Sequence, residues 1–181
     1  MKTPSLHKEV EFKYDIKVTL ADLLKATQNY HGRTYVQGND YYFKNKNKDL
    51  IRFRDGEGHK ELTVKRKINK SISVRDEVNI TLDPDTDLDS VSKFLKLSGF
   101  ELDRTIYKSA HIFYLRDHIV SYYFAKSNNK FKELLEIEIQ EGTYSNTKQA
   151  KKRLLQLEKH YAKLGCEKSK RVNKSLYEIY S

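Results

Sequence analysis

The chain has 181 residues, enough for one domain, and its 13 Tyr and 8 Phe supply apolar area for a core although only 38% of the residues are hydrophobic. A net charge of +10 points to an anionic partner, such as a phosphate compound, nucleic acid or an acidic surface. The single Cys excludes a disulfide framework. No apolar run is long enough for a membrane span or a secretory leader. We therefore expect a cytoplasmic protein with one domain over residues 1–181.

The first half of the chain is predicted to be mostly strands. Apolar and charged residues alternate over residues 9–13, as in a half-buried strand. Residues 19–27 have helical spacing, and Thr19 is placed to cap that helix. Further strands are expected over residues 31–36, 40–43, 50–54, 61–67 and 73–82, with a break around Gly38-Asn39 and a hairpin turn at residues 55–58.

The second half is predicted to consist of a helix, further strands and a long basic helix. A helix over residues 87–97 is expected to turn Val91, Phe94 and Leu95 inward. Strands are predicted over residues 100–109, 112–115, 119–125 and 134–140, followed by a basic helix over residues 146–164 that ends at Gly165 and a tail over 174–180. We favour a solvated face for the lysines of that helix over nucleic-acid contact, because its apolar residues are spaced for one buried stripe.

Several predicted strands carry all of their charges on one face. For any single strand this pattern fits an ordinary sheet with one face in water. The repetition of charged pairs two residues apart instead suggests that these strands line the interior of one barrel. The residues on this charged face are the cations Lys13, Arg52, Arg54, Lys65, Lys67 and Arg75 and the anions Glu9, Glu11, Glu77, Glu136 and Glu138.

An interior of this composition suits a particular kind of guest. Buried charges cost several kcal/mol each unless they are paired or ligated. Arginine and lysine bind phosphate oxygens, and paired carboxylates offer hard oxygen ligands to Mg²⁺ or Mn²⁺. We therefore expect a polyphosphate that carries a divalent metal. The six scattered His residues have no zinc-site spacing, and there is no phosphate-binding Gly loop or Ser-His-Asp arrangement.

The ordered motifs resemble the CYTH or triphosphate tunnel metalloenzymes, a family that includes class IV adenylate cyclases, thiamine triphosphatases and inorganic triphosphatases. The resemblance covers roughly residues 8–180, and its C-terminal part, residues 174–179, is similar to the tail of the class IV cyclases. The motifs, in chain order, are Glu9-x-Glu11-x-Lys13, Asp40-Tyr41-Tyr42-Phe43, Arg52-x-Arg54, Leu62-Thr63-Val64-Lys65, Arg75-x-Glu77 and Glu136-x-Glu138.

The resemblance implies an α+β fold, a closed eight-stranded antiparallel β-barrel with helices packed outside. It also implies Mg²⁺ or Mn²⁺ as cofactor and a nucleoside triphosphate or other polyphosphate as ligand. The roles it implies are catalytic for Glu9, Glu11 and Lys13; phosphate-binding for Arg52, Arg54, Lys65, Lys67, Arg75 and Lys108; and metal-binding for Glu9, Glu11, Glu77, Glu136 and Glu138.

The expected activity is that of a metal-dependent enzyme that converts ATP into cyclic AMP and pyrophosphate, as class IV adenylate cyclases do. Two departures from the family pattern keep alternatives open. Only Lys108 is kept of a basic cluster, and Tyr122-Tyr123 stands where the family has Leu-Asp. The alternatives are an inorganic or organic triphosphatase and a nucleotide- or polyphosphate-binding domain without turnover. We expect no membrane or nucleic-acid partner, and a homodimer stays open.

Overall fold

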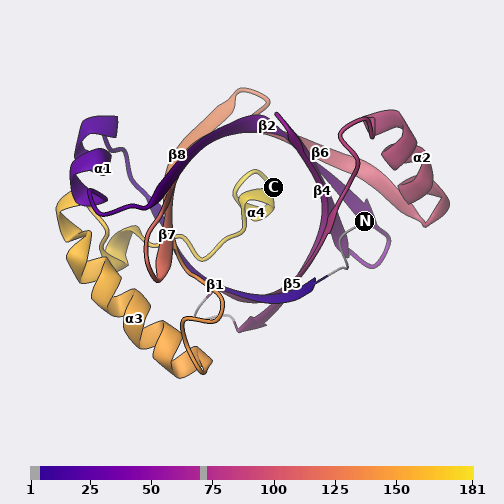
Figure 1. Ribbon diagram of the computed structural model, residues 1–181. Helices are drawn as coiled ribbons and strands as arrows, with labels where there is room; N and C mark the ends of the chain where they lie inside the picture. Colours follow the sequence, from indigo (N-terminus) through magenta and orange to yellow (C-terminus); the bar gives the residue numbers. More distant parts are fainter. Residues whose placement is uncertain (1–4, 70–72) are drawn as a thin grey trace.

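The computed structural model describes residues 5–69 and 73–181, and the side chains of residues 8–65 and 74–181. In this part of the chain, eight strands form a closed antiparallel barrel (Figure 1). Around the barrel the order is β1-β5-β4-β3-β2-β6-β7-β8. This confirms the expected α+β barrel. The strands are β1 (Ser5–Asp15), β2 (Gly32–Asn45), β3 (Leu50–Gly56), β4 (His59–Asn69), β5 (Ser73–Thr81), β6 (Phe100–Tyr114), β7 (His118–Ser127) and β8 (Lys130–Ile139).

The helices lie around this barrel. Figure 1 shows α1 (Leu20–Ala26) and α3 (Thr147–His160) on one side and α2 (Leu88–Leu97) on the other, whereas α4 (Leu176–Ile179) lies within the ring. The basic helix is shorter than expected. It continues as a 3-10 turn (Ala162–Leu164) that Gly165 ends at a φ of 92°, and a second 3-10 turn (Lys168–Lys170) follows. Of the helices described, none has the length and apolar character needed to cross a membrane.

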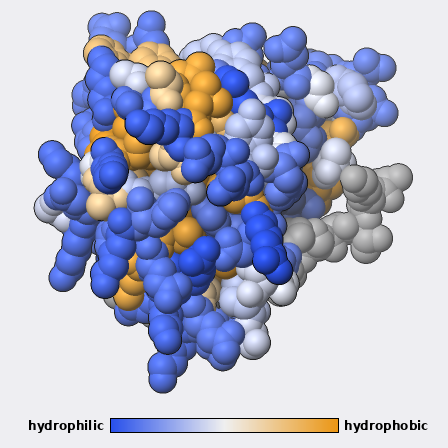
Figure 2. All heavy atoms as spheres, turned by 60° about the vertical axis from the view of Figure 1, so that its left-hand side comes forward, coloured by the Kyte–Doolittle hydropathy of each residue, from blue (hydrophilic) through white to orange (hydrophobic). Residues whose placement is uncertain are grey.

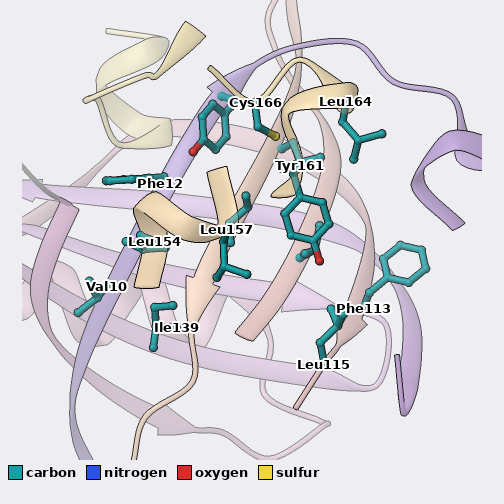
Figure 3. Close-up of a cluster of buried hydrophobic side chains, with 14 of the residues drawn as sticks. Val10, Phe12, Phe113, Leu115, Ile139, Leu154, Leu157, Tyr161, Leu164 and Cys166 are labelled. Atoms are coloured by element: carbon teal, nitrogen blue, oxygen red, sulfur yellow. The ribbon is translucent and has the colours of Figure 1, made fainter. Parts of the chain in front are cut away.

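Apolar side chains of β1 and β8 point outward, where α3 covers them. Val10 and Phe12 of β1 share one core with Leu154 and Leu157 of α3 and with Ile139 of β8 (Figure 3). Full burial of each such side chain stabilises the fold by roughly 1.5–3 kcal/mol. Because side chains alternate along a strand, packing this face against α3 turns the charged face into the barrel.

Gly38 does not interrupt β2, although the sequence suggested two separate strands around it. Residues 32–45 form one continuous strand that pairs with both β3 and β6. A Cβ at Gly38 would lie 2.3 Å from the carbonyl oxygen of Asp55 and 2.6 Å from the Cα of Gly56. The glycine is therefore required by the close approach of β3. Residues 100–114 likewise form one strand, β6, where the sequence suggested two strands over 100–109 and 112–115.

Helix α2 buries fewer residues than its spacing suggested. Val91 and Leu95 pack against Phe43 and Phe53 on the outside of the barrel, as expected. Phe94 was expected to face inward as well, but 63% of it is exposed. Val91 and Leu95, one turn apart, already face these aromatic residues, so the expectation for Phe94 was wrong.

The face that carries α1 and α3 is mostly hydrophilic, with apolar patches between the polar side chains (Figure 2). Lys148, Lys151, Lys152 and Lys159 of α3 are exposed. The buried stripe of the same helix consists of Ala150, Leu154 and Leu157. The lysines thus form the solvated face of an amphipathic helix.

Candidate active site

The barrel encloses a cavity of about 710 Å³ that is lined mainly by charged side chains. Every predicted site residue whose side chain is described lines this cavity. Lys67 lies on β4, but its side chain is outside the described residues. The predicted residues on the cavity wall are Glu9, Glu11, Lys13, Arg52, Arg54, Lys65, Arg75, Glu77, Lys108, Glu136 and Glu138.

Carboxylates gather where β1 lies beside β8. Glu11 pairs in register with Glu138, and Lys13 with Glu136. Burial, together with Glu136 and Glu9, raises the pKa of Glu11 to about 7. Burial, together with Glu9 and Glu11, also raises the pKa of Glu138 well above its ordinary value. At both carboxyls, burial and the neighbouring carboxylates thus outweigh the nearby cations.

The positive charge of Lys13 partly offsets the negative charge of these carboxylates. Its side chain is 3% exposed, and its Nζ lies 2.8 Å from Oε1 of Glu136 and 3.6 Å from Oε1 of Glu11. Burial opposes the ionisation of Glu136, but Lys13 and Lys108 outweigh it and lower the pKa of Glu136. Glu136 also accepts a hydrogen bond from the Tyr123 hydroxyl at 2.8 Å. The ammonium group of Lys13 therefore lies closer to Glu136 than to Glu11.

The cations on β4 and β5 face the first two glutamates of β1. The Nζ of Lys65 lies 3.0 Å from Oε1 of Glu9 and 2.6 Å from Oε2 of Glu77. Arg75 Nη1 lies 3.4 Å from Glu11 Oε1 and 3.7 Å from Glu9 Oε2. Burial opposes the ionisation of Glu9, but Lys65 and Arg75 outweigh it and lower the pKa of Glu9. The cationic and carboxylate groups of the cavity are therefore in contact.

The arginines of β3 are held by two carboxylates that sequence reasoning did not include in the site. Asp40 accepts hydrogen bonds from Nε and Nη2 of Arg54, at 2.7 and 2.9 Å. Glu61 accepts one from Arg52 Nη2 at 2.9 Å. The sequence did indicate both residues, because Asp40 begins the Asp40-Tyr41-Tyr42-Phe43 motif and Glu61 shares strand parity with Lys65. These pairs hold both guanidinium groups at fixed positions on the cavity wall.

Lys108 differs from the other buried cations of the cavity. Within the described side chains, no carboxylate lies within 4.0 Å of its Nζ, which instead sits 3.9 Å from the centre of the Tyr123 ring. Burial lowers the pKa of Lys108 to about 8. This lysine is therefore free to contact an anion without giving up an ion pair.

Several buried polar atoms in the cavity have no hydrogen-bond partner. On the donor side these are Nε of Arg52 and both Nε and Nη2 of Arg75, and on the acceptor side Oε1 of Glu11 and Oδ1 of Asn79. Such groups cost about 1–3 kcal/mol each unless something satisfies them. The donors suit phosphate oxygens and the Glu11 oxygen suits a cation, so the residues present fit a phosphate chain with a divalent ion. In the described residues no group of three or more His, Cys, Asp or Glu is already arranged to hold a metal ion.

The C-terminal segment lines part of the cavity. The backbone N–H of Val172 donates to the carbonyl of Lys13 at 2.8 Å, and the Tyr180 hydroxyl donates to the carbonyl of Ala125 at 2.6 Å. Leu176 is buried against residues of β7 and β8. Both anchoring carbonyls lie near the C-terminal ends of β1 and β7. Figure 1 shows α4 within the ring.

Comparison with solved structures shows the same fold in proteins of low sequence identity. The chain is 21% identical to a conserved hypothetical protein from Pyrococcus furiosus, with a TM-score of 0.74 over 94% of this chain and 99% of that one. A "putative adenylate cyclase" from Vibrio parahaemolyticus is 18% identical, with a TM-score of 0.72 over 95% and 97% of the two chains.

A "putative adenylyl cyclase" from Hippeastrum, described as having a dominant triphosphatase activity, is 13% identical, with a TM-score of 0.63 over 96% and 94% of the two chains. No curated protein matches the sequence. The family model of the CYTH domain matches residues 7–172, which is most of the chain. With the closed barrel and its charged interior, this match shows that the chain belongs to the CYTH domain family.

Proposed function

We propose that this protein is a divalent-metal-dependent enzyme that acts on a triphosphate inside the barrel. The observation that carries the proposal is the cavity wall itself, where buried guanidinium donors without partners face a crowded group of carboxylates. Among the described residues that line the cavity, nine are cationic and nine are acidic. A triphosphate adds several negative charges to this balanced wall, and divalent cations are the natural way to offset them.

The residues have distinct tasks in this proposal. Arg52, Arg54, Lys65 and Arg75 bind the phosphate chain, and Lys108 adds a cation that carries no competing ion pair. Glu9, Glu11, Glu136 and Glu138, with Glu77 beside Lys65, would hold one or two Mg²⁺ or Mn²⁺ ions. A bound ion of this kind polarises the phosphoryl group that it contacts. The closed barrel wall surrounds the phosphate chain and limits its contact with bulk water.

The first candidate reaction is that of a class IV adenylate cyclase. The ribose 3′-hydroxyl of ATP attacks the α-phosphorus, the bond from that phosphorus to the bridging oxygen of the β-phosphate breaks, and pyrophosphate leaves with cyclic AMP as the other product. Lys13, held between Glu136 and Glu11, orients the two carboxylates for this step. The arginines hold the leaving pyrophosphate by bidentate contacts.

A triphosphatase is the second candidate. In this reaction, water attacks the terminal phosphorus, the bond from that phosphorus to the oxygen that bridges to the next phosphate breaks, and the diphosphate leaves with inorganic phosphate as the other product. Tyr123, whose hydroxyl donates to Glu136 at 2.8 Å, stands where the family pattern has an Asp, and this departure keeps the second reaction open beside the first. The triphosphatase activity of the Hippeastrum protein, which has the same fold, is a further reason to measure this product.

The direct test incubates the purified protein with ATP or tripolyphosphate and Mn²⁺. Cyclic AMP with pyrophosphate identifies a cyclase, and phosphate identifies a triphosphatase. Glu9→Gln is expected to lower turnover at least about 100-fold, whereas Glu101→Gln, an exposed change, is expected to have no effect. Binding by calorimetry without any product would identify a binding domain, and no binding of either compound would refute the proposal.

A further inference from the structure

The positive charge of this protein is concentrated in one segment outside the barrel. Residues 147–171, which comprise α3 and the two 3-10 turns after it, hold seven lysines and two arginines against two glutamates. The segment therefore has a net charge of +7, out of +10 for the whole chain. None of its residues, all of which are described, lines the barrel cavity.

The two arginines of this segment are paired within the protein, whereas its lysines are not. Arg153 Nε lies 2.6 Å from Oδ2 of Asp117, and Arg171 Nη2 lies 2.6 Å from Oε2 of Glu158. All seven lysines are exposed, and no described carboxylate lies within 4.0 Å of any of them. The outer surface of the segment therefore presents seven unpaired cations and a single exposed carboxylate, that of Glu167.

The lysines of α3 form a row on a rigid support. At 3.6 residues per turn, Lys148, Lys152 and Lys159 fall on one side of the helix, and Lys151 lies next to them. From Lys148 to Lys159 the row is about 16 Å long, at 1.5 Å per residue. The buried stripe of α3 lies on the opposite side and packs against β1 and β8, so the row is fixed to the barrel and faces away from it.

The chemistry of this surface favours one kind of polyanion. Lysine is depleted at protein–protein interfaces. Of the large apolar side chains of α3, only Leu155 is exposed, so the helix has no apolar face with which to enter a membrane. Tyr161 is buried and offers no surface on which a free base could stack. A duplex, by contrast, carries one phosphate charge per about 1.7 Å of its axis, and lysines contact these phosphates without reading the sequence.

We propose that the lysines of α3 and of the turns after it bind the phosphate backbone of a nucleic-acid duplex, without sequence preference. The surface lies outside the barrel, so this inference is independent of the proposed function. The sequence favoured a solvated face with no such partner because the spacing of apolar residues fixes only the buried side of the helix. The structure adds that the lysines carry no internal ion pairs and stand on a rigid support.

Fluorescence anisotropy with a labelled DNA duplex of about 20 base pairs, between about 50 and 200 mM salt, tests the proposal. If five lysines contact phosphates, log K falls against log salt with a slope of about −4.5. Lys148→Gln/Lys152→Gln/Lys159→Gln is expected to make this slope shallower by about 2.7 and to weaken binding at least about tenfold at the lowest salt.

The matched control removes the same charge from exposed positions away from α3. Lys46→Gln/Lys93→Gln/Lys96→Gln changes the turn between β2 and β3 and the helix α2, which lies on the other side of the barrel (Figure 1). This variant is expected to weaken duplex binding less than about threefold, since charges farther away than about 8–10 Å are largely screened. A second duplex of unrelated sequence should bind the wild type with the same affinity.

Three results would overturn the proposal. One is an equal loss of affinity in the two triple variants, which would mean that net charge alone attracts the duplex. The others are a wild-type slope shallower than about −2, and binding to vesicles that contain phosphatidylserine without binding to the duplex. Should the α3 variant fail to fold, as judged by circular dichroism, Lys152→Gln alone is expected to make the slope shallower by about 0.9.

Discussion

Glu11 is a buried carboxyl with an unsatisfied oxygen, although Lys13 and Arg75 lie near it. It is 3% exposed, its Oε1 has no hydrogen-bond partner, and burial beside Glu136 and Glu9 raises its pKa to about 7. Replacing this carboxyl by an uncharged amide is expected to raise the stability of the folded protein when no metal is added. We expect Glu11→Gln to raise Tm by about 2–4 °C, the shift that about 1 kcal/mol gives in a chain of this size.

The same variant tests the metal site. Mn²⁺ is expected to raise Tm of the wild type and to leave Tm of Glu11→Gln unchanged, as measured by differential scanning fluorimetry. Glu101→Gln serves as the control because it changes an exposed glutamate by the same atoms. An equal response of wild type and Glu11→Gln to Mn²⁺ would argue against Glu11 as a ligand.

Lys108 gives a prediction about pH. Burial lowers the pKa of Lys108 to about 8 in the folded protein, below its ordinary value of 10.5. Between these values the unfolded chain binds more protons than the folded one, so this group makes the free energy of unfolding rise with pH from about 8 to 10.5. Phosphate binding depends on pH in the opposite direction, because it requires the protonated, charged form of Lys108.

We therefore expect the affinity for tripolyphosphate to fall as pH rises from about 7 to 9, by up to about tenfold. Lys108→Arg should remove this dependence, because a guanidinium keeps its charge over the whole range. Calorimetry at several pH values measures both proteins. A wild type whose affinity is flat over this range would show that Lys108 does not contact the phosphate chain.

At the scale of the strands, Gly38 gives a matched pair of substitutions within β2. Gly38→Ala places a Cβ 2.3 Å from a backbone oxygen of β3, so the strand or the β3–β4 hairpin must move. At Gly32 the nearest atom to an added Cβ is 3.5 Å away, in a Tyr114 side chain. Urea unfolding is expected to show a loss of at least about 2 kcal/mol for Gly38→Ala and less than about 1 kcal/mol for Gly32→Ala. Equal losses would mean that the close approach is not what constrains Gly38.

Strand parity in the sequence was enough to predict which side chains face the interior. Once Val10 and Phe12 are assigned to the apolar face, the period of two places Glu9, Glu11 and Lys13 on the other. Parity says nothing about which strands are neighbours, so the contact of Arg54 with Asp40 could not be derived. The position of α4 inside the ring could not be predicted from the sequence either, because it depends on contacts such as that of Tyr180 with Ala125, 55 residues apart.

At the scale of the whole molecule, the net charge and the charge of the site are separate quantities. The described lining of the cavity is balanced, so the excess of +10 lies mostly on other surfaces, including the exposed lysines of α3. The basic composition first suggested an anionic ligand, yet most of that charge does not line the site. The balanced interior was recognised from the alternation of charges along the strands.

This separation predicts that the outer lysines do not contribute to triphosphate binding. Lys151→Ala/Lys152→Ala on α3 is expected to change the Kd for tripolyphosphate less than about twofold at 0.15 M salt, where exposed charges farther apart than about 8 Å are largely screened. Lys65→Ala, which removes a cavity cation, is expected to weaken binding about 100-fold. A comparable loss in both variants, measured by calorimetry, would place the ligand on the outside of the barrel.

The pairing of β1 with β8 has a consequence for how the protein is made. β1 is complete at residue 15, but its partner β8 ends at residue 139. At about 5–20 residues per second, a ribosome needs roughly 6–25 s to reach that point. During this interval the strand that carries Glu9, Glu11 and Lys13 lacks one neighbour, so the emerging chain must stay soluble throughout it before the ring can close.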